Sequence, residues 1–116
     1  MTDYPTCVNI DTNKEGKMIL ELQSFEMIEK ADVPGGYQCV LEFGDYHQLS
    51  IISGDGAYGG DKGLYEIAVI INGDFASLPG INNHVEDDVL GYLTADEVSA
   101  IIKKMYLLTG KTPSQV

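Results

Sequence analysis

The sequence predicts an α+β fold in which an antiparallel β-meander of four to five strands packs on one C-terminal α-helix. Two short turn motifs between apolar segments, Gly44-Asp45 and Asn72-Gly73, indicate β-hairpins. After residue 94, apolar residues recur at the spacing of a helix face. The 116 residues suffice for one core and contain no linker or repeat, so we expect a single domain over 1–116, with 1–7 as a flexible arm.

The segment 18–31 fits two kinds of secondary structure. Met18, Leu20 and Leu22 alternate as in a strand, whereas Met18, Leu22 and Phe25 recur as on a helix. Its Glu, Leu and Met content favours a helix, while the turn before it and the hairpins after it favour a strand. We expect a strand and keep the helix as the alternative.

The first hairpin joins predicted strands over 37–43 and 46–53. Its two-residue turn, with glycine first, suits a type II′ turn and pairs Phe43 with Tyr46. The same register places His47 opposite Glu42, as a cross-strand pair beside the turn.

This register also decides which side chains face the core. Val40, Leu49 and Ile51 share one face, which we take as the core side. The other face is also apolar and needs cover from the N-terminal segment or from a second subunit, so we expect a homodimer. That face carries Tyr37, Cys39, Leu41, Phe43, Tyr46 and Ile52.

The second hairpin follows a strand over 64–72 that is almost continuously apolar and therefore central in the sheet. Asn72-Gly73 returns the chain as an edge strand over 74–78, which Pro79 ends. Residues 79–92 are rich in glycine, asparagine and acids, and we expect a loop there.

The helix is expected over 95–108. Thr94 and Glu97 form a Thr-x-x-Glu capping box at its start, and Gly110 ends it. The predicted buried stripe consists of Val98, Ile101, Ile102, Met105 and Leu108.

Charge is the most informative global property. The chain has 18 acidic residues against seven lysines and no arginine, a net charge of −11. Residues 31–102 hold twelve of the acids and only Lys62. A protein that tracks nucleic-acid phosphates needs basic groups, so direct nucleic-acid binding is excluded.

Composition also indicates the cellular compartment. No apolar run approaches the length of a membrane span, and the N-terminus shows no signal peptide. Two cysteines, Cys7 and Cys39, are too few for a disulfide framework. We expect a soluble protein of the cytoplasm.

The glycine-rich loop 53–63 contains Gly54, Gly56 and Gly59 at the spacing of a dinucleotide-binding turn. A strand follows where that motif needs a helix, and Asp55 and Asp61 would repel a phosphate. We expect a tightly turned or mobile connection, in which Tyr58 is a reasonable contact residue.

No catalytic or metal site is expected, and no cofactor. His84 with the acids at 86–88 is the one cluster of ligand types, and it lacks the spacing of a calcium loop. Cys39 lies on the face opposite to His47 and Glu42 in the expected register, so no nucleophile meets a base. The alternative is a small hydrolase or nucleotide- or metal-binding protein that uses the loops 53–63 and 79–92.

Two stretches resemble segments of small, uncharacterised acidic proteins encoded by bacteriophages and prophages. They are YGGDKGLYEIAV at 58–69 and DVLGYLTADEV at 88–98. The resemblance covers about residues 37–109 and carries no catalytic residue. It implies a phage accessory protein in the cytoplasm of the bacterial host, where such proteins bind and inhibit host factors, including defence nucleases.

The functional hypothesis is that the acidic middle of the chain binds a basic host protein. In an extended form of this hypothesis, its carboxylates take the place of the nucleic-acid phosphates that the partner normally binds. Acidity that serves only solubility is the simpler alternative. A structural protein that acts as a homo-oligomer is another. The predicted partner-binding residues are Glu42, Asp45, Asp55, Tyr58, Asp61, Glu86, Asp87 and Asp88.

Overall fold

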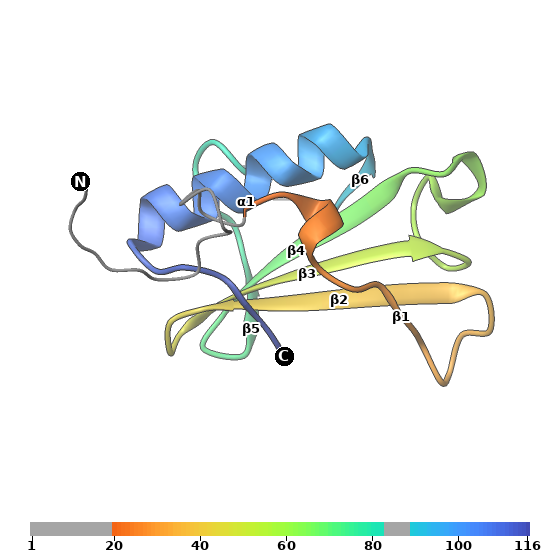
Figure 1. The fold of residues 1–116 in the computed structure, drawn as a ribbon, viewed down its shortest axis with the longest axis horizontal. Coiled ribbons are helices and arrows are strands. Elements are labelled where there is room, and N and C mark those ends of the chain that lie inside the picture. The colour runs from red at the N-terminus through yellow and green to blue at the C-terminus, as the bar shows by residue number, and fades with distance from the viewer. Residues whose placement is uncertain (1–19, 83–88) are drawn as a thin grey trace, which may run out of the picture.

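The fold is an antiparallel β-sheet with one α-helix packed on one of its faces (Figure 1), as the sequence predicts. A computed structural model describes residues 20–82 and 89–116. Within these residues the strands are β1 (Ile28–Glu29), β2 (Gly36–Phe43), β3 (His47–Gly54), β4 (Tyr65–Ile71), β5 (Asp74–Ala76), β6 (Val89–Leu93) and β7 (Ser114–Gln115). The helix is α1 (Ala95–Thr109), and two 3₁₀ turns are η1 (Leu22–Ser24) and η2 (Gly60–Lys62).

The first hairpin corrects the predicted register by one residue. Its turn has three residues, Gly44 to Tyr46, so Phe43 pairs with His47 and not with Tyr46. Gly44 has φ 80°, a left-handed backbone conformation that glycine adopts without strain. Because side chains alternate along a strand, the shift exchanges the two faces of β2.

The core therefore lies on the face of β2 that we expected to be uncovered. Cys39, Leu41 and Phe43 are buried beneath the helix, whereas Val40 lies on the opposite face. On β3, Leu49 and Ile51 face the core as predicted. The homodimer expectation thus loses the apolar face on which it rested.

The helix confirms its prediction most closely. The Thr94 amide donates to Glu97 Oε1 at 2.8 Å and the Glu97 amide to Thr94 Oγ1 at 3.1 Å, which completes the capping box. Gly110, at φ 69°, ends the helix. The buried stripe stops at Met105, because Leu108 is 57% exposed.

The segment 18–31, which fits both the strand and the helix pattern, forms neither a long strand nor a helix in its described part, 20–31. Among its described residues, only Ile28 and Glu29 form a strand, and Leu22 lies in the turn η1. Leu22 is buried, and its amide donates to Ser99 Oγ on α1 at 2.9 Å. Packing of single apolar side chains, not a continued periodicity, holds this segment.

Two strands lie where the sequence analysis expects none. β6 falls inside the predicted loop 79–92 and pairs with β4 beside Tyr65 to Ala68, next to the stretch that pairs with β5. β7 pairs with β2 at Leu41 and Glu42, on the same edge as β1. Each outer edge of the sheet is therefore covered by two short strands placed end to end.

The central strand and the second hairpin are as predicted. β4 lies between β3 and the pair β5 and β6, and its Ile67 and Val69 are fully buried. Asn72 and Gly73, at φ 55° and 84°, form the turn, and β5 is shorter than expected. Asn82, 2% exposed, closes the following bend by accepting from the Leu78 amide and donating to the Ala76 carbonyl.

The opposite face of the sheet alternates between apolar and polar side chains. None of the described elements packs on it in the way that α1 packs on the core face (Figure 1). The residues of β2, β3 and β4 on this face are Gln38, Val40, Glu42, Gln48, Ser50, Ile52, Glu66, Ala68 and Ile70.

Candidate protein-binding surface

The predicted partner-binding residues do not form one surface. Glu42 and Asp45 lie at the turn end of the β2–β3 hairpin, and Asp55, Tyr58 and Asp61 lie in the loop at its other end. Strands of eight residues separate the two groups by roughly 26 Å. Glu86, Asp87 and Asp88, together with His84, lie outside the described residues.

The loop 53–63 is tightly turned and uses its own backbone amides. Seven amides between residues 55 and 64 donate to protein oxygens: those of Asp55, Ala57, Tyr58, Gly60, Lys62, Gly63 and Leu64. A Cβ at Gly60 would lie 1.8 Å from the Gly54 carbonyl oxygen, so only glycine fits there. These amides are not free to cradle a phosphate, which the dinucleotide motif requires.

Tyr58 and Tyr92 are joined through their backbones. The Tyr92 amide donates to the Tyr58 carbonyl oxygen at 3.1 Å. A Cβ at Gly91 would lie 2.5 Å from Tyr58 Cβ, and a Cβ at Gly59 would lie 2.9 Å from Tyr92 Cδ1. Each glycine thus lets the tyrosine of the other segment approach, and together the four residues form what we call the tyrosine pair site.

Glu66 anchors this site from below. Its side chain is only 7% exposed, and its Oε1 accepts the Tyr58 amide at 2.8 Å. Both backbone groups of Tyr58 are therefore satisfied, one by Glu66 and one by Tyr92. The sequence analysis counted Glu66 among the net charges, whereas the structure gives it a positioning role.

Both tyrosine side chains project to the surface. Tyr58 is 60% exposed and Tyr92 is 59% exposed. Tyr92 has φ 58°, a left-handed conformation that costs a non-glycine residue about 1–2 kcal/mol. Lys62 Nζ lies 5.9 Å from the centroid of the Tyr92 ring, within cation–π range.

The sequence analysis missed Tyr92, although a signal for it was present. Tyr58-Gly59 and Gly91-Tyr92 are mirrored dipeptides, one in each of the two stretches that carry the phage resemblance. Nothing local indicates that they meet, since β6 must first pair with β4.

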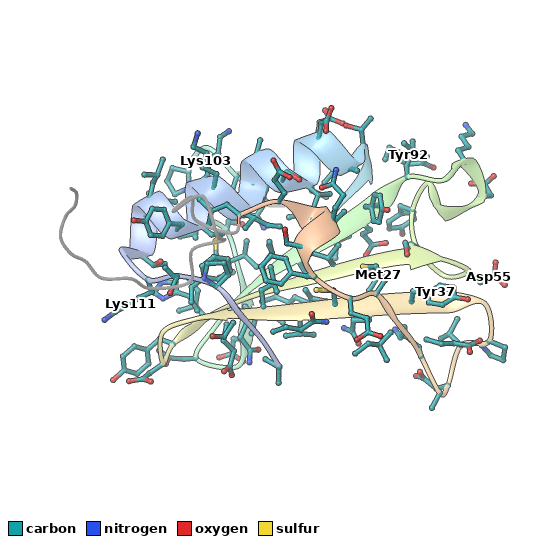
Figure 2. The ribbon with its side chains drawn as sticks, in the orientation of Figure 1. Met27, Tyr37, Asp55, Tyr92, Lys103 and Lys111 are labelled. Carbon is teal, nitrogen blue, oxygen red and sulfur yellow. The ribbon has the colours of Figure 1, made fainter. Side chains whose placement is uncertain are left out.

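Carboxylates are near both tyrosines in the sequence. Asp55 and Asp61 are exposed in the same loop, and Asp96 and Glu97 lie in the first turn of α1, which follows Tyr92. Lys103 and Lys111 lie toward the other end of the molecule (Figure 2). Since Glu42 and Asp45 lie at the turn end of the β2–β3 hairpin, both ends of this hairpin carry carboxylates, whereas these two lysines lie away from the loop 53–63.

The groups considered for catalysis are arranged differently from the prediction. His47 pairs with Phe43 and not with Glu42 as predicted, so it shares a face with Cys39. Glu42 pairs with Gln48 and accepts a hydrogen bond from Gln48 Nε2 at 3.1 Å. Burial raises the pKa of the Cys39 thiol to about 11, so it is neutral at pH 7. Three cross-strand pairs separate Cys39 from His47 along the hairpin.

Metal-ligating side chains and three surface grooves are the other features that could form a small-ligand site. Within 20–82 and 89–116, no group of three or more His, Cys, Asp or Glu side chains could hold a metal ion. Three open grooves of about 220 to 310 Å³ lie beside β1 and α1. None of these three is lined by Asp55, Tyr58 or Asp61.

Comparison with protein-family models, with curated proteins and with solved structures gave no match. In the part of the chain that the structure describes, no helix has the length and apolar character needed to cross a membrane.

Proposed function

We propose that this protein is a non-enzymatic phage accessory protein that binds a basic host protein in the bacterial cytoplasm. The observation that carries the proposal is the exposed, backbone-locked pair Tyr58 and Tyr92 among exposed carboxylates. The partner class is a nucleic-acid-binding protein or a defence factor, and inhibition follows if the carboxylates occupy the place of its phosphates.

The chemistry of the loop end suits a protein interface. Tyrosine is enriched at such interfaces because its ring supplies a large contact area at little conformational cost. Exposed carboxylates such as Asp55 and Asp61 steer a basic partner and increase its association rate. In contrast, Glu42 and Asp45 lie too far away to belong to the same contact, so they form a second, separate part of the proposed surface. Glu86, Asp87 and Asp88 remain in the proposal as residues near β6 in sequence.

Affinity capture from host lysate at low salt, followed by binding measurements on the purified captured protein, tests the proposal. We expect Asp55→Lys with Asp61→Lys to weaken binding at least tenfold, the effect of about 1.4 kcal/mol. Glu26→Lys with Asp74→Lys changes the net charge equally at exposed sites outside the loop and should have a much smaller effect. Equal effects of the two double variants would contradict the proposal.

The enzyme alternative has a separate test. A thermal-shift screen with nucleotides and divalent cations should give no large, saturable stabilisation. A stabilisation by one ligand that Asp61→Asn or His84→Ala abolishes would replace the proposal with a ligand-binding or catalytic function. The homodimer and the homo-oligomeric assembly role stay predictions, and light scattering of the purified protein decides them.

A further inference from the structure

We propose that the tyrosine pair site receives an arginine side chain of the partner, and that Lys62 occupies this position in the free protein. This inference rests on the proposed function and names the chemistry of its contact. Lys62 is the observation that points to a cation, because its ammonium nitrogen already lies 5.9 Å from the Tyr92 ring centroid.

The internal contact is weak enough for a ligand to replace it. Lys62 is exposed, and a cation–π contact at an exposed site changes an equilibrium only about two- to fivefold. A guanidinium is planar, is less strongly hydrated than an ammonium and stacks on aromatic faces. It also pairs with carboxylates through two hydrogen bonds, and Asp61 adjoins Lys62 in the chain. Tyr92 therefore offers an arginine a ring face, and the exposed Asp61 is the carboxylate next to Lys62 in the sequence.

The site is also organised before binding. The amide and the carbonyl of Tyr58 are both hydrogen-bonded, and Gly59 and Gly91 fix the approach of the two segments. Little backbone ordering remains to oppose the association. Tyr92 holds a left-handed backbone conformation while its side chain stays exposed, so its backbone is placed without burial of the ring.

Binding of labelled peptides measures the preference without knowledge of the natural partner. The probes are three nine-residue peptides in which glycine alternates with arginine, with lysine or with glutamine. Their binding is measured by fluorescence anisotropy at low salt. We expect the arginine peptide to bind several-fold more tightly than the lysine peptide, and the glutamine peptide to show no binding.

Ring variants test the contact itself. Tyr58→Leu with Tyr92→Leu should weaken binding of the arginine peptide by about two- to fivefold per ring. Tyr58→Phe with Tyr92→Phe keeps both ring faces and should retain binding. Tyr46→Leu is the matched control, because Tyr46 is 63% exposed at the opposite end of the hairpin. Circular-dichroism melts establish that each variant is folded.

Lys62→Met provides a test with both rings intact. It should tighten binding of the arginine peptide more than Lys103→Met does, although Lys103→Met removes the same charge from α1. The arginine site would be overturned if Lys62→Met and Lys103→Met tightened binding of the arginine peptide equally, or if the leucine and phenylalanine double variants weakened it equally. Neither result would contradict the acidic binding surface itself. If neither cationic peptide binds at all, the proposed function fails as well.

Discussion

The backbone amide of Tyr92 on β6 donates a hydrogen bond to the carbonyl oxygen of Tyr58, 3.1 Å away in the glycine-rich loop. This single bond joins a segment after β3 to a segment before α1. It explains how a glycine-rich loop, with seven of its amides hydrogen-bonded within the protein, holds the backbone of exposed Tyr58 next to that of exposed Tyr92. The predictions below test this arrangement first and the rest of the fold next.

Gly91→Ala should separate the two tyrosines. The new Cβ would lie 2.5 Å from Tyr58 Cβ, and overpacking of this kind costs about 1–3 kcal/mol. Hydrogen exchange at the Tyr92 amide should accelerate. Gly63→Ala is the control, because Gly63 has φ 75° but nothing within 4 Å of its Cβ position, so it should cost stability and leave Tyr92 protected. Unchanged protection of Tyr92 in Gly91→Ala would argue against the link.

Glu66→Ala should destabilise the protein by about 1–3 kcal/mol, since it leaves the partly buried Tyr58 amide without its acceptor. Glu66→Gln keeps a side-chain oxygen at the same place and should lose less. Urea unfolding measures both, with Glu42→Ala as an exposed control expected within 0.5 kcal/mol of the parent. If alanine and glutamine at position 66 cost the same, the carboxylate does not anchor the loop.

Cys39 should make the folded state less stable at alkaline pH. Its folded pKa is raised from 9.0 to about 11, so the unfolded chain loses this proton first as the pH rises. The contribution of the thiol is therefore complete below about pH 9 and declines up to about pH 11. Parallel urea melts of the parent and Cys39→Ala should converge across that window. A constant difference between them would show that the thiol titrates normally.

Gln115→Ala should loosen the edge of β2. The Gln115 side-chain amide accepts the Glu26 amide at 2.9 Å and donates to the Glu26 carbonyl, which ties β7 to the segment before β1. Loss of the two bonds should cost about 1–2 kcal/mol and speed exchange at the Glu26 and Val116 amides. Gln48→Ala, which breaks only an exposed pair with Glu42, should leave both amides protected.

Local chemistry explains which elements could be predicted. The capping box at Thr94, the Gly110 stop and the Asn72-Gly73 turn each depend on neighbours in sequence, and all three are confirmed. The predicted register of the first hairpin was wrong because the turn has three residues and not two, and a shift of one residue reverses a whole strand face. β6 and β7 are short, and only pairing with distant strands makes them extended.

The candidate surface was predictable to a smaller degree. Asp55, Tyr58 and Asp61 are exposed together as expected from their loop. Their separation from Glu42 and Asp45 depends on strand length in three dimensions, which charge counting ignores. Tyr92 lies beside Tyr58 only because β6 pairs with β4, and local sequence patterns do not predict a contact of this kind.

A chemical-shift map of the ¹⁵N-labelled protein titrated with the arginine–glycine peptide tests the central claim most directly, because it reports every acidic segment in one experiment. We expect the largest shifts at Asp55, Tyr58, Asp61 and Tyr92, decreasing as salt is added. Small shifts are expected around Asp45, at the other end of the same hairpin. Shifts spread evenly over acids at both ends, or centred on the turn at 44–46, would contradict a binding surface built on the tyrosine pair site.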